Sequence, residues 1–219
     1  MADGFERMIH DARAFFAELS QNNTRDWYEA HKERYVDGVK KPAEFLIDLI
    51  AEDLSRRTGA TVKPKLFRIH RDVRFSKDKT PYKTHLHMMW SPVDGGVLTP
   101  KWFFGLGDGY FILGLGVMGL QGDALDQYRR FVDNHGEALQ TALDGAAESA
   151  GAQISDWGPP VLKRVPKPYS PDHPHAELLK RKALAISAPM PADWEQVGVV
   201  KAVNTRIEDL LPIYRVLNR

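Results

Sequence analysis

The stretch that decides the fold runs from Lys101 to Val117 and reads Lys-Trp-Phe-Phe-Gly-Leu-Gly-Asp-Gly-Tyr-Phe-Ile-Leu-Gly-Leu-Gly-Val. Apolar and aromatic residues fill both halves, and Gly107-Asp108-Gly109 separates them. Two such runs joined by a short glycine-containing connection are typical of a β-hairpin. We therefore predict two antiparallel strands over 102–106 and 110–117.

The second half of this stretch continues as Gly114-Leu115-Gly116-Val117-Met118-Gly119, which matches the Gly-x-Gly-x-x-Gly pattern of dinucleotide-binding folds. We reject that interpretation, because the strand before the pattern belongs to a hairpin and no later strand ends in an acidic ribose partner. The glycines more simply permit close packing or a bulge. No cofactor is predicted.

Two further strands are predicted upstream, from apolar and polar residues that alternate with a period of two. The first spans 66–75 and is interrupted at Arg71, which indicates a bend, a bulge or an arginine that reaches a buried partner. A charged turn at 76–81 leads into the second strand, over 82–90. A short strand is also predicted at 185–188.

Apolar residues at helical spacing predict helices before and after these strands. They span residues 7–19, 27–41, 42–58, 123–134, 136–150 and 197–214. Residues 157–175 contain six prolines and are predicted to form a loop that wraps the domain. We expect a single α+β domain over residues 1–219, with a mainly antiparallel central sheet of four to five strands flanked by N-terminal and C-terminal helices.

Composition narrows the possible classes of protein. The chain of 219 residues is 43% hydrophobic, enough for a normal core, and it has no cysteine. Disulfides, thiolate nucleophiles and sulfur-ligated zinc are thereby excluded. No stretch approaches the ~18 consecutive apolar residues of a membrane span, and the first residues lack the apolar core of a signal peptide. We expect a cytoplasmic protein with no membrane partner.

Positive charge is concentrated between Lys63 and Lys83, where eight basic residues face two acidic ones, a net charge of +6 in a chain whose total is +1. Such a concentration is costly unless carboxylates or a bound anion neutralise it. The isoelectric point near 8.0 is below the value above about 9 that is typical of dedicated nucleic-acid-binding domains. A nucleic-acid partner is therefore disfavoured.

The best candidate site is one face of the strand predicted at 66–75, which presents Arg68, His70, Asp72 and Arg74 at spacings of roughly 6.6–6.8 Å. A guanidinium at each end suits a phosphate or carboxylate clamp. His70 and Asp72, together with Tyr82, are predicted to transfer protons. The predicted ligand-binding residues are Arg68, Arg71, Arg74, Lys77, Lys79 and Lys83.

The same residues also fit a purely structural role. In that alternative Asp72 pairs with Arg74, acidic helices pair with the other cations, and the turn at 76–81 is solvated surface. A second basic group in the proline-rich segment either extends the same cleft or forms a solvated rim. Its members are Lys163, Arg164, Lys167, Lys180, Arg181 and Lys182.

Two His-x-His pairs, His85 with His87 and His173 with His175, offer imidazole ligands for a first-row metal. No carboxylate lies within a few residues of the first pair, and a proline separates the second. Ordinary polar histidines explain both pairs better, so no metal site is predicted.

Three stretches together resemble the bacterial and fungal family of domain of unknown function 2461 (DUF2461). The resemblance spans nearly the whole chain and implies a single α+β domain, but it implies no activity. Pro168 stands where that pattern leads us to expect glycine, and His87 and His175 lie outside the pattern. The matching stretches are Asn22-Asn23-x-Arg25-x-Trp27-Tyr28-x-x-His31-Lys32-x-x-Tyr35, residues 67–84, and Pro166-Lys167-x-Tyr169 with Asp172-His173-Pro174 and Leu178-Leu179.

The sequence supports three hypotheses about function. The first is binding of, or catalysis on, a small phosphorylated or carboxylated ligand in a basic cleft built by residues 68–83. The second is a structural or interaction module with an internal ion-pair network. The third is a nucleic-acid contact protein. Neither the oligomeric state nor the question of enzymatic activity is decided by the sequence.

Overall fold

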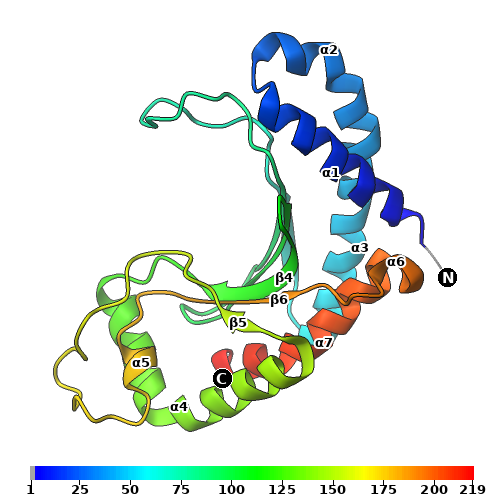
Figure 1. Cartoon of the computed structure of the whole chain (residues 1–219). Helices are drawn as coiled ribbons and strands as arrows, with labels where there is room; N and C mark the ends of the chain where they lie inside the picture. Colours follow the sequence, from blue (N-terminus) through cyan, green and yellow to red (C-terminus); the bar gives the residue numbers. More distant parts are fainter. Residues whose placement is uncertain (1–2) are drawn as a thin grey trace.

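A computed structural model describes residues 3–219 and shows one six-stranded antiparallel sheet in the order β1-β2-β3-β4-β6-β5 (Figure 1). The α+β class predicted from the sequence is confirmed, with six strands rather than four to five. The predicted hairpin is confirmed as β3 and β4. The strands are β1 (Val62–Leu66), β2 (Leu86–Pro92), β3 (Lys101–Gly107), β4 (Tyr110–Val117), β5 (Gln153–Ile154) and β6 (Leu184–Pro189).

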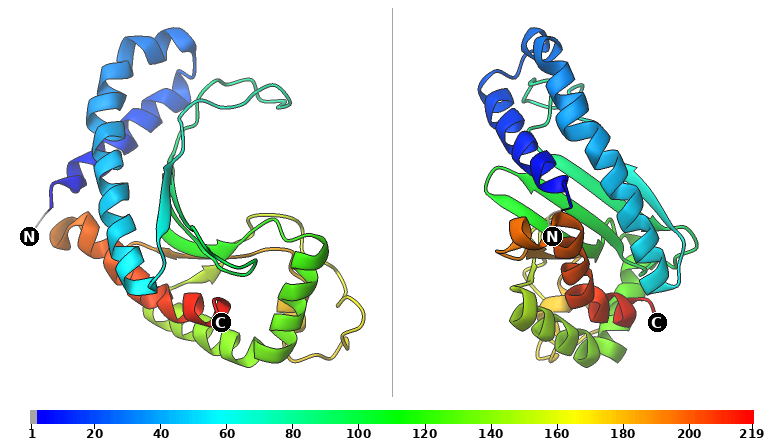
Figure 2. Two further views of the ribbon diagram at one scale, coloured as in Figure 1. Left: turned by 180° about the vertical axis from the view of Figure 1, so that it is seen from behind. Right: turned by 90° about the vertical axis from the view of Figure 1, so that its right-hand side faces the viewer.

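Helices α1, α3 and α7 pack on one face of this sheet, and α4 extends from its lower end (Figures 1 and 2). Within residues 3–219, none of the helices combines the length and apolar composition that crossing a bilayer requires. The helices are α1 (Phe5–Gln21), α2 (Arg25–Tyr35), the π-helical turn η1 (Val36–Lys40), α3 (Lys41–Thr58), α4 (Gly122–Ala150), α5 (Ala176–Leu179), α6 (Trp194–Val197) and α7 (Val199–Leu217).

One helix, α4, replaces the two helices predicted at 123–134 and 136–150, so that prediction was wrong. The helix continues through Gly136, where a side chain would lie 2.2 Å from the His175 ring of the proline-rich segment. Glycine is there because another part of the chain packs against the helix, and not because the helix ends. Packing thus overrides the weak helix propensity of glycine.

The helix-covered face of the sheet forms the core. In β2, Leu86, Met88 and Trp90 are buried, and the Trp90 indole donates a 2.8 Å hydrogen bond to the carbonyl of Ile47 in α3. Burying each large apolar side chain contributes roughly 2–3 kcal/mol. The residues that alternate with them point to the opposite face, which we call the open face: Lys65, His87, Met89, Phe103 and Ile112.

Glycines on the open face allow β4 to approach β6 closely. A Cβ atom at Gly114 would lie 2.3 Å from the carbonyl oxygen of Ile186, and one at Gly116 would lie 2.3 Å from that of Leu184. No side chain fits at such distances, so only glycine permits this approach. The close packing predicted for these glycines is confirmed, and the sheet curves toward the open face (Figure 1).

The strand predicted over 66–75 was wrong, because β1 ends at Leu66. The strand predicted over 82–90 begins only at Leu86. Residues 67–85 instead form an irregular hairpin, here called the arm, which projects from the sheet (Figure 1) and contains one isolated bridge, His70 to Tyr82. The period-two pattern also fails at Phe75, which is 96% exposed.

Local side-chain hydrogen bonds explain why the arm is not a regular ladder. The Asp72 carboxylate accepts from the Arg74 amide, and the Asp78 carboxylate accepts from the Thr80 amide. Aspartates that bind nearby backbone amides offer the chain an alternative to strand pairing. These bonds keep the amides of Arg74 and Thr80 out of the strand pairing that the apolar pattern predicts.

The arm is anchored to the turn between α1 and α2. The Asn23 side chain accepts a hydrogen bond from the Tyr82 amide at 3.1 Å and donates one to the Tyr82 carbonyl at 2.9 Å. The Tyr82 ring stacks on Tyr28 of α2 with ring centroids 4.2 Å apart. The base of the arm therefore has a fixed position relative to the sheet.

Replacing Asn23 with alanine removes both hydrogen bonds and leaves a partly buried amide and carbonyl of Tyr82 without partners. We expect Asn23→Ala to lower the free energy of unfolding by about 1–3 kcal/mol, measured by urea denaturation. Asn134→Ala is the matched control, because Asn134 is exposed on α4 and contacts only its own helix. Equal stability of Asn23→Ala and the wild type would contradict the anchor.

Candidate functional site

Two of the predicted anion-binding arginines are neutralised within the arm itself. Arg71 contacts the Asp78 carboxylate and the Thr80 hydroxyl. Arg74 donates hydrogen bonds of 2.9 and 2.6 Å to the two oxygens of Asp72. The pKa of each aspartate is lowered chiefly by the hydrogen bonds from its arginine. The Asp72–Arg74 pair is the one that the structural alternative predicts, whereas Arg71 pairs with Asp78 of the arm and not with an acidic helix.

Three other cations, here called the cation cluster, lie at the base of the arm: Lys65, Arg68 and Lys83. The ammonium groups of Lys65 and Lys83 lie 4.9 and 5.6 Å from the centre of the same ring, that of Phe67. Within residues 3–219, no carboxylate lies within 4.0 Å of any of the three. These three cations therefore lack an ion-pair partner, although the charge of Arg68 contributes to the lowered pKa of Asp72.

The charge state of Lys83 reflects this environment. Burial lowers the pKa of its ammonium, and the positive charges of Arg68 and Lys65 lower it further. The group donates one 2.9 Å hydrogen bond, to the neutral carbonyl of Arg68. A negatively charged group bound beside Lys83 would therefore reduce the repulsion among Lys83, Arg68 and Lys65.

Two histidines continue the site along the open face. The rings of His85 and His87 stack with centroids 4.0 Å apart. Burial, together with the charges of Lys83 and Arg71, lowers the pKa of His85. Burial, together with His85 and Lys83, lowers the pKa of His87 to about 4. Both rings are consequently neutral at neutral pH and add polar groups without adding charge.

Tyr110 completes this side of the site. Its hydroxyl lies 2.8 Å from Nε2 of His87, and its ring covers Gly107, where a Cβ atom would lie 2.5 Å from the ring. Glycine on β3 thus makes room for the tyrosine of β4 to lie across the strand. Burial raises the pKa of the Tyr110 hydroxyl, which keeps it protonated.

The three residues predicted for proton transfer do not converge on the cation cluster. Tyr82 and His70 face each other at a ring separation of 5.1 Å and pack against Tyr28 of α2. The Asp72 carboxylate is held by Arg74. A catalytic role for His70, Asp72 and Tyr82 stays a prediction.

The remaining predicted ligand-binding lysines lie near the tip of the arm. Lys77 is exposed, and the Lys79 ammonium donates a 3.0 Å hydrogen bond to the Val73 carbonyl. Neither approaches the cation cluster through any of these contacts. Of the six predicted ligand-binding residues, Arg68 and Lys83 are the pair that the fold brings together at the base of the arm.

The second His-x-His pair attaches the proline-rich loop to α4. His173 is hydrogen-bonded to the Asp133 carboxylate at 3.1 Å, and His175 lies 3.8 Å from the Glu137 carboxylate. Within residues 3–219, no three or more His, Asp or Glu side chains are grouped so as to hold a metal ion.

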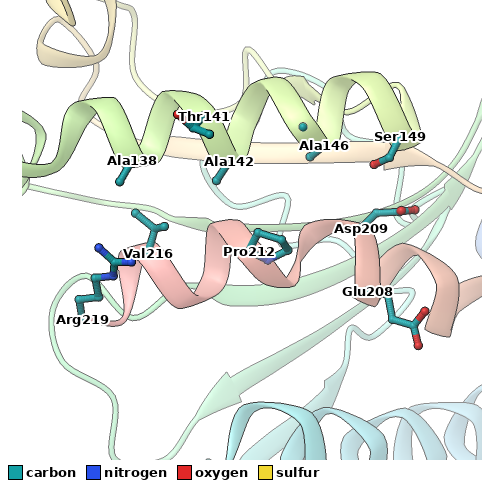
Figure 3. Close-up of a pocket in the computed structure, with 11 residues that line it drawn as sticks. Ala138, Thr141, Ala142, Ala146, Ser149, Glu208, Asp209, Pro212, Val216 and Arg219 are labelled. Carbon is teal, nitrogen blue, oxygen red and sulfur yellow. The ribbon is translucent and has the colours of Figure 1, made fainter.

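A groove of about 640 Å³ between α4 and α7 is a separate feature (Figure 3). Alanines of α4 line one side of it, and Glu208, Asp209 and Pro212 of α7 line the other. Both acidic side chains are already paired, Glu208 with Arg57 and Asp209 with Arg206, at 2.8 and 2.7 Å. The groove contains none of the residues predicted to bind a ligand.

The fold and the site define an α+β protein with one antiparallel sheet, in which Lys65 of β1 and Arg68 and Lys83 of the arm form a cluster without ion-pair partners among the described residues. The chain belongs to the family described as conserved hypothetical protein (DUF2461), whose family model matches residues 11–215. A comparison with curated proteins gave no match. Two of the three stretches that resemble the family meet in the structure, where Asn23 binds Tyr82.

Sequence patterns indicated the wrong face for part of this site. The sequence placed Lys65 in the basic segment but did not mark it as a ligand-binding residue. Phe67 and Tyr110 were predicted only as strand residues, with no part in a site. The alternation of Lys83, His85 and His87 was a usable signal, since it puts all three on one side of an extended chain. The sequence pattern did not reveal that β1 ends at Leu66. Beyond that residue the chain is irregular, and its side chains no longer alternate between the two faces as predicted.

The lowered pKa of His87 makes stability depend on pH. Because an unfolded histidine binds a proton near pH 6.5 and folded His87 only near pH 4, stability falls as the pH drops through this interval. With discounting for the partly exposed ring, the loss is about 1–2 kcal/mol. Urea denaturation at both ends of the interval measures it.

His87→Gln keeps a polar group beside Tyr110 but cannot titrate, so we expect it to lose less stability than the wild type over the same interval. His135→Gln, on the exposed surface of α4, is the control. An identical pH dependence in wild type and His87→Gln would show that the His87 ring is protonated as easily in the folded protein as in the unfolded chain.

Proposed function

We propose that this protein binds a small phosphorylated or carboxylated ligand at the cation cluster, on the open face at the base of the arm. The supporting observation is the contrast in charge compensation along one segment. Arg71 and Arg74 have aspartate partners, whereas Lys65, Arg68 and Lys83 have no carboxylate within 4.0 Å among the described residues.

The chemistry of the cluster suits an anion with several oxygens. Lysine ammonium groups act as compact positive charges, and an arginine guanidinium binds oxygen pairs through two parallel hydrogen bonds. The neutral imidazoles of His85 and His87 add donors or acceptors beside the charges. The affinity for such an anion would therefore depend directly on these side chains.

The ligand need not be enclosed. The cations lie on a sheet face and on the base of an anchored arm, and Lys65 is exposed to solvent. Anion binding there would be of moderate strength and would weaken as salt is added, because exposed charges are screened over about 8–10 Å at physiological ionic strength. This is a property that the binding experiment can measure.

The structural alternative is favoured for the outer part of the arm. The ion pairs Arg71–Asp78 and Arg74–Asp72 stabilise its irregular conformation and need no ligand. Ligand binding at the base of the arm is compatible with a structural role for these ion pairs, because the two roles involve different residues.

Charge removal at the cluster tests the proposal. We expect pyrophosphate or citrate to bind the wild type at low ionic strength in calorimetric titration, and Lys65→Met/Lys83→Met to bind at least about tenfold more weakly, a loss of about 1.4 kcal/mol. Methionine preserves the unbranched apolar stem while removing the charge.

Lys201→Met, an exposed lysine of α7, is the matched control for a general loss of positive charge. Arg74→Gln should also leave affinity nearly unchanged, because Asp72 already neutralises this arginine. The proposal is wrong if neither anion binds the wild type, or if the double variant and Lys201→Met bind equally well.

A further inference from the structure

An aromatic corner lies on the open face next to the cation cluster. The rings of Phe103 in β3 and Trp157, which follows β5, have centroids 5.0 Å apart and planes inclined at 57°. Trp157 is 47% exposed, whereas Trp90 and Trp102 are completely buried. An exposed indole set at an angle against a second ring offers two aromatic surfaces to one ligand.

The register of the sheet aligns this corner with the cluster. Lys65 of β1 is paired with Met89 of β2, and Met89 is paired with Phe103 of β3. All three side chains point to the open face. Since neighbouring strands lie about 4.8 Å apart, the backbone of Lys65 and that of Phe103 are separated by roughly 10 Å, with one flexible methionine between them.

Glycine gives Phe103 its orientation. A Cβ atom at Gly114, the partner of Phe103 in β4, would lie 2.2 Å from the Phe103 ring. The ring therefore lies down across β4, in space that a side chain would otherwise fill. Together with the exposed Trp157 indole, this half-buried ring offers aromatic surface to a planar group.

Positive charge is present on the far side of the corner as well. Arg181 and Lys182 line a hollow of about 260 Å³ with Trp157, and Asp156 is the one acidic residue among its lining residues. The Nε atom of Arg181 is buried and has no hydrogen-bond partner among the described residues. The second basic group of the sequence thus reaches the aromatic corner through these two residues.

We propose that the ligand of the open face is a nucleoside phosphate, with its phosphate at Lys65 and Lys83 and its base on the corner formed by Phe103 and Trp157. This inference rests on the proposed function and adds the class of ligand. Every nucleobase has an aromatic face, so stacking on the corner tolerates any of the four bases. Lys65 and Phe103 belong to one cross-strand row with Met89 between them, and a ligand with an anionic and a planar part would span that row.

A comparison of ligands with and without a base tests this assignment. The probes are the four common nucleoside 5′-monophosphates and ribose 5-phosphate, which has the same sugar and phosphate but no base. We expect at least one nucleotide to bind about tenfold more tightly than ribose 5-phosphate and to quench tryptophan fluorescence. Trp27→Phe, which removes a half-buried tryptophan of α2, should retain that quenching.

Variants at the corner assign the effect to these rings. Trp157→Leu and Phe103→Leu should lose the advantage of the nucleotide while keeping the affinity for ribose 5-phosphate, and circular dichroism checks that they are folded. The inference is overturned if nucleotides bind no better than ribose 5-phosphate, or if Trp157→Leu retains their advantage. Binding of pyrophosphate or citrate in the same preparation would leave the proposed function standing, whereas failure of both anions to bind would remove the proposed function and this inference together.

A short single-stranded oligonucleotide identifies the source of the nucleoside phosphate. Tighter binding than any mononucleotide, with an affinity that falls steeply as salt rises, assigns the site to a nucleic-acid strand. Equal or weaker binding assigns it to a free nucleotide. In both cases, Trp157→Leu must bind the tighter of these two ligands more weakly than the wild type does.

Discussion

The close approach of β4 to β6 is the constraint on which the rest of the structure depends. Side chains at Gly114 and Gly116 would collide with backbone carbonyls 2.3 Å away, so these positions must be glycine for β4 and β6 to pair as they do. Helices bury only the other face, which is sufficient because antiparallel strands alternate between a core side and a solvent side. The polar residues of the open face therefore remain accessible.

Anchoring of the arm turns this accessible face into a charged one. Like charges on a mobile loop would move apart, but the hydrogen bonds of Asn23 to Tyr82 and the stacking of Tyr82 on Tyr28 fix the base of the arm beside β1. Asp72 and Asp78 form their ion pairs with cations farther along the arm, and of the three cations at its base only Arg68 acts on Asp72, without a contact within 4.0 Å. The fold thereby holds Lys65 and Lys83 against one aromatic ring with repulsion between them.

The periodicity of apolar residues in the sequence was sufficient to predict the helices and strands of the core. The hairpin of β3 and β4 and the long helices follow from patterns of period two and 3.6, because burial of one face imposes those periods. It was insufficient for the arm, where aspartate side chains compete for backbone amides, and for Gly136, where His175 from a distant segment explains the glycine. The candidate site lies at the base of the arm, where periodicity failed, so its residues were only partly predicted from the sequence.

The pKa of Lys83 is the quantity most sensitive to the charge around the cation cluster, and titration of carbon-13-labelled lysine by nuclear magnetic resonance measures it. We expect Lys83 to titrate below the 10.5 of an unperturbed lysine and its pKa to rise when pyrophosphate is added, since a bound anion favours the charged ammonium. A Lys83 that titrates at the ordinary value, and does not respond to pyrophosphate, would contradict an uncompensated cation cluster on the open face.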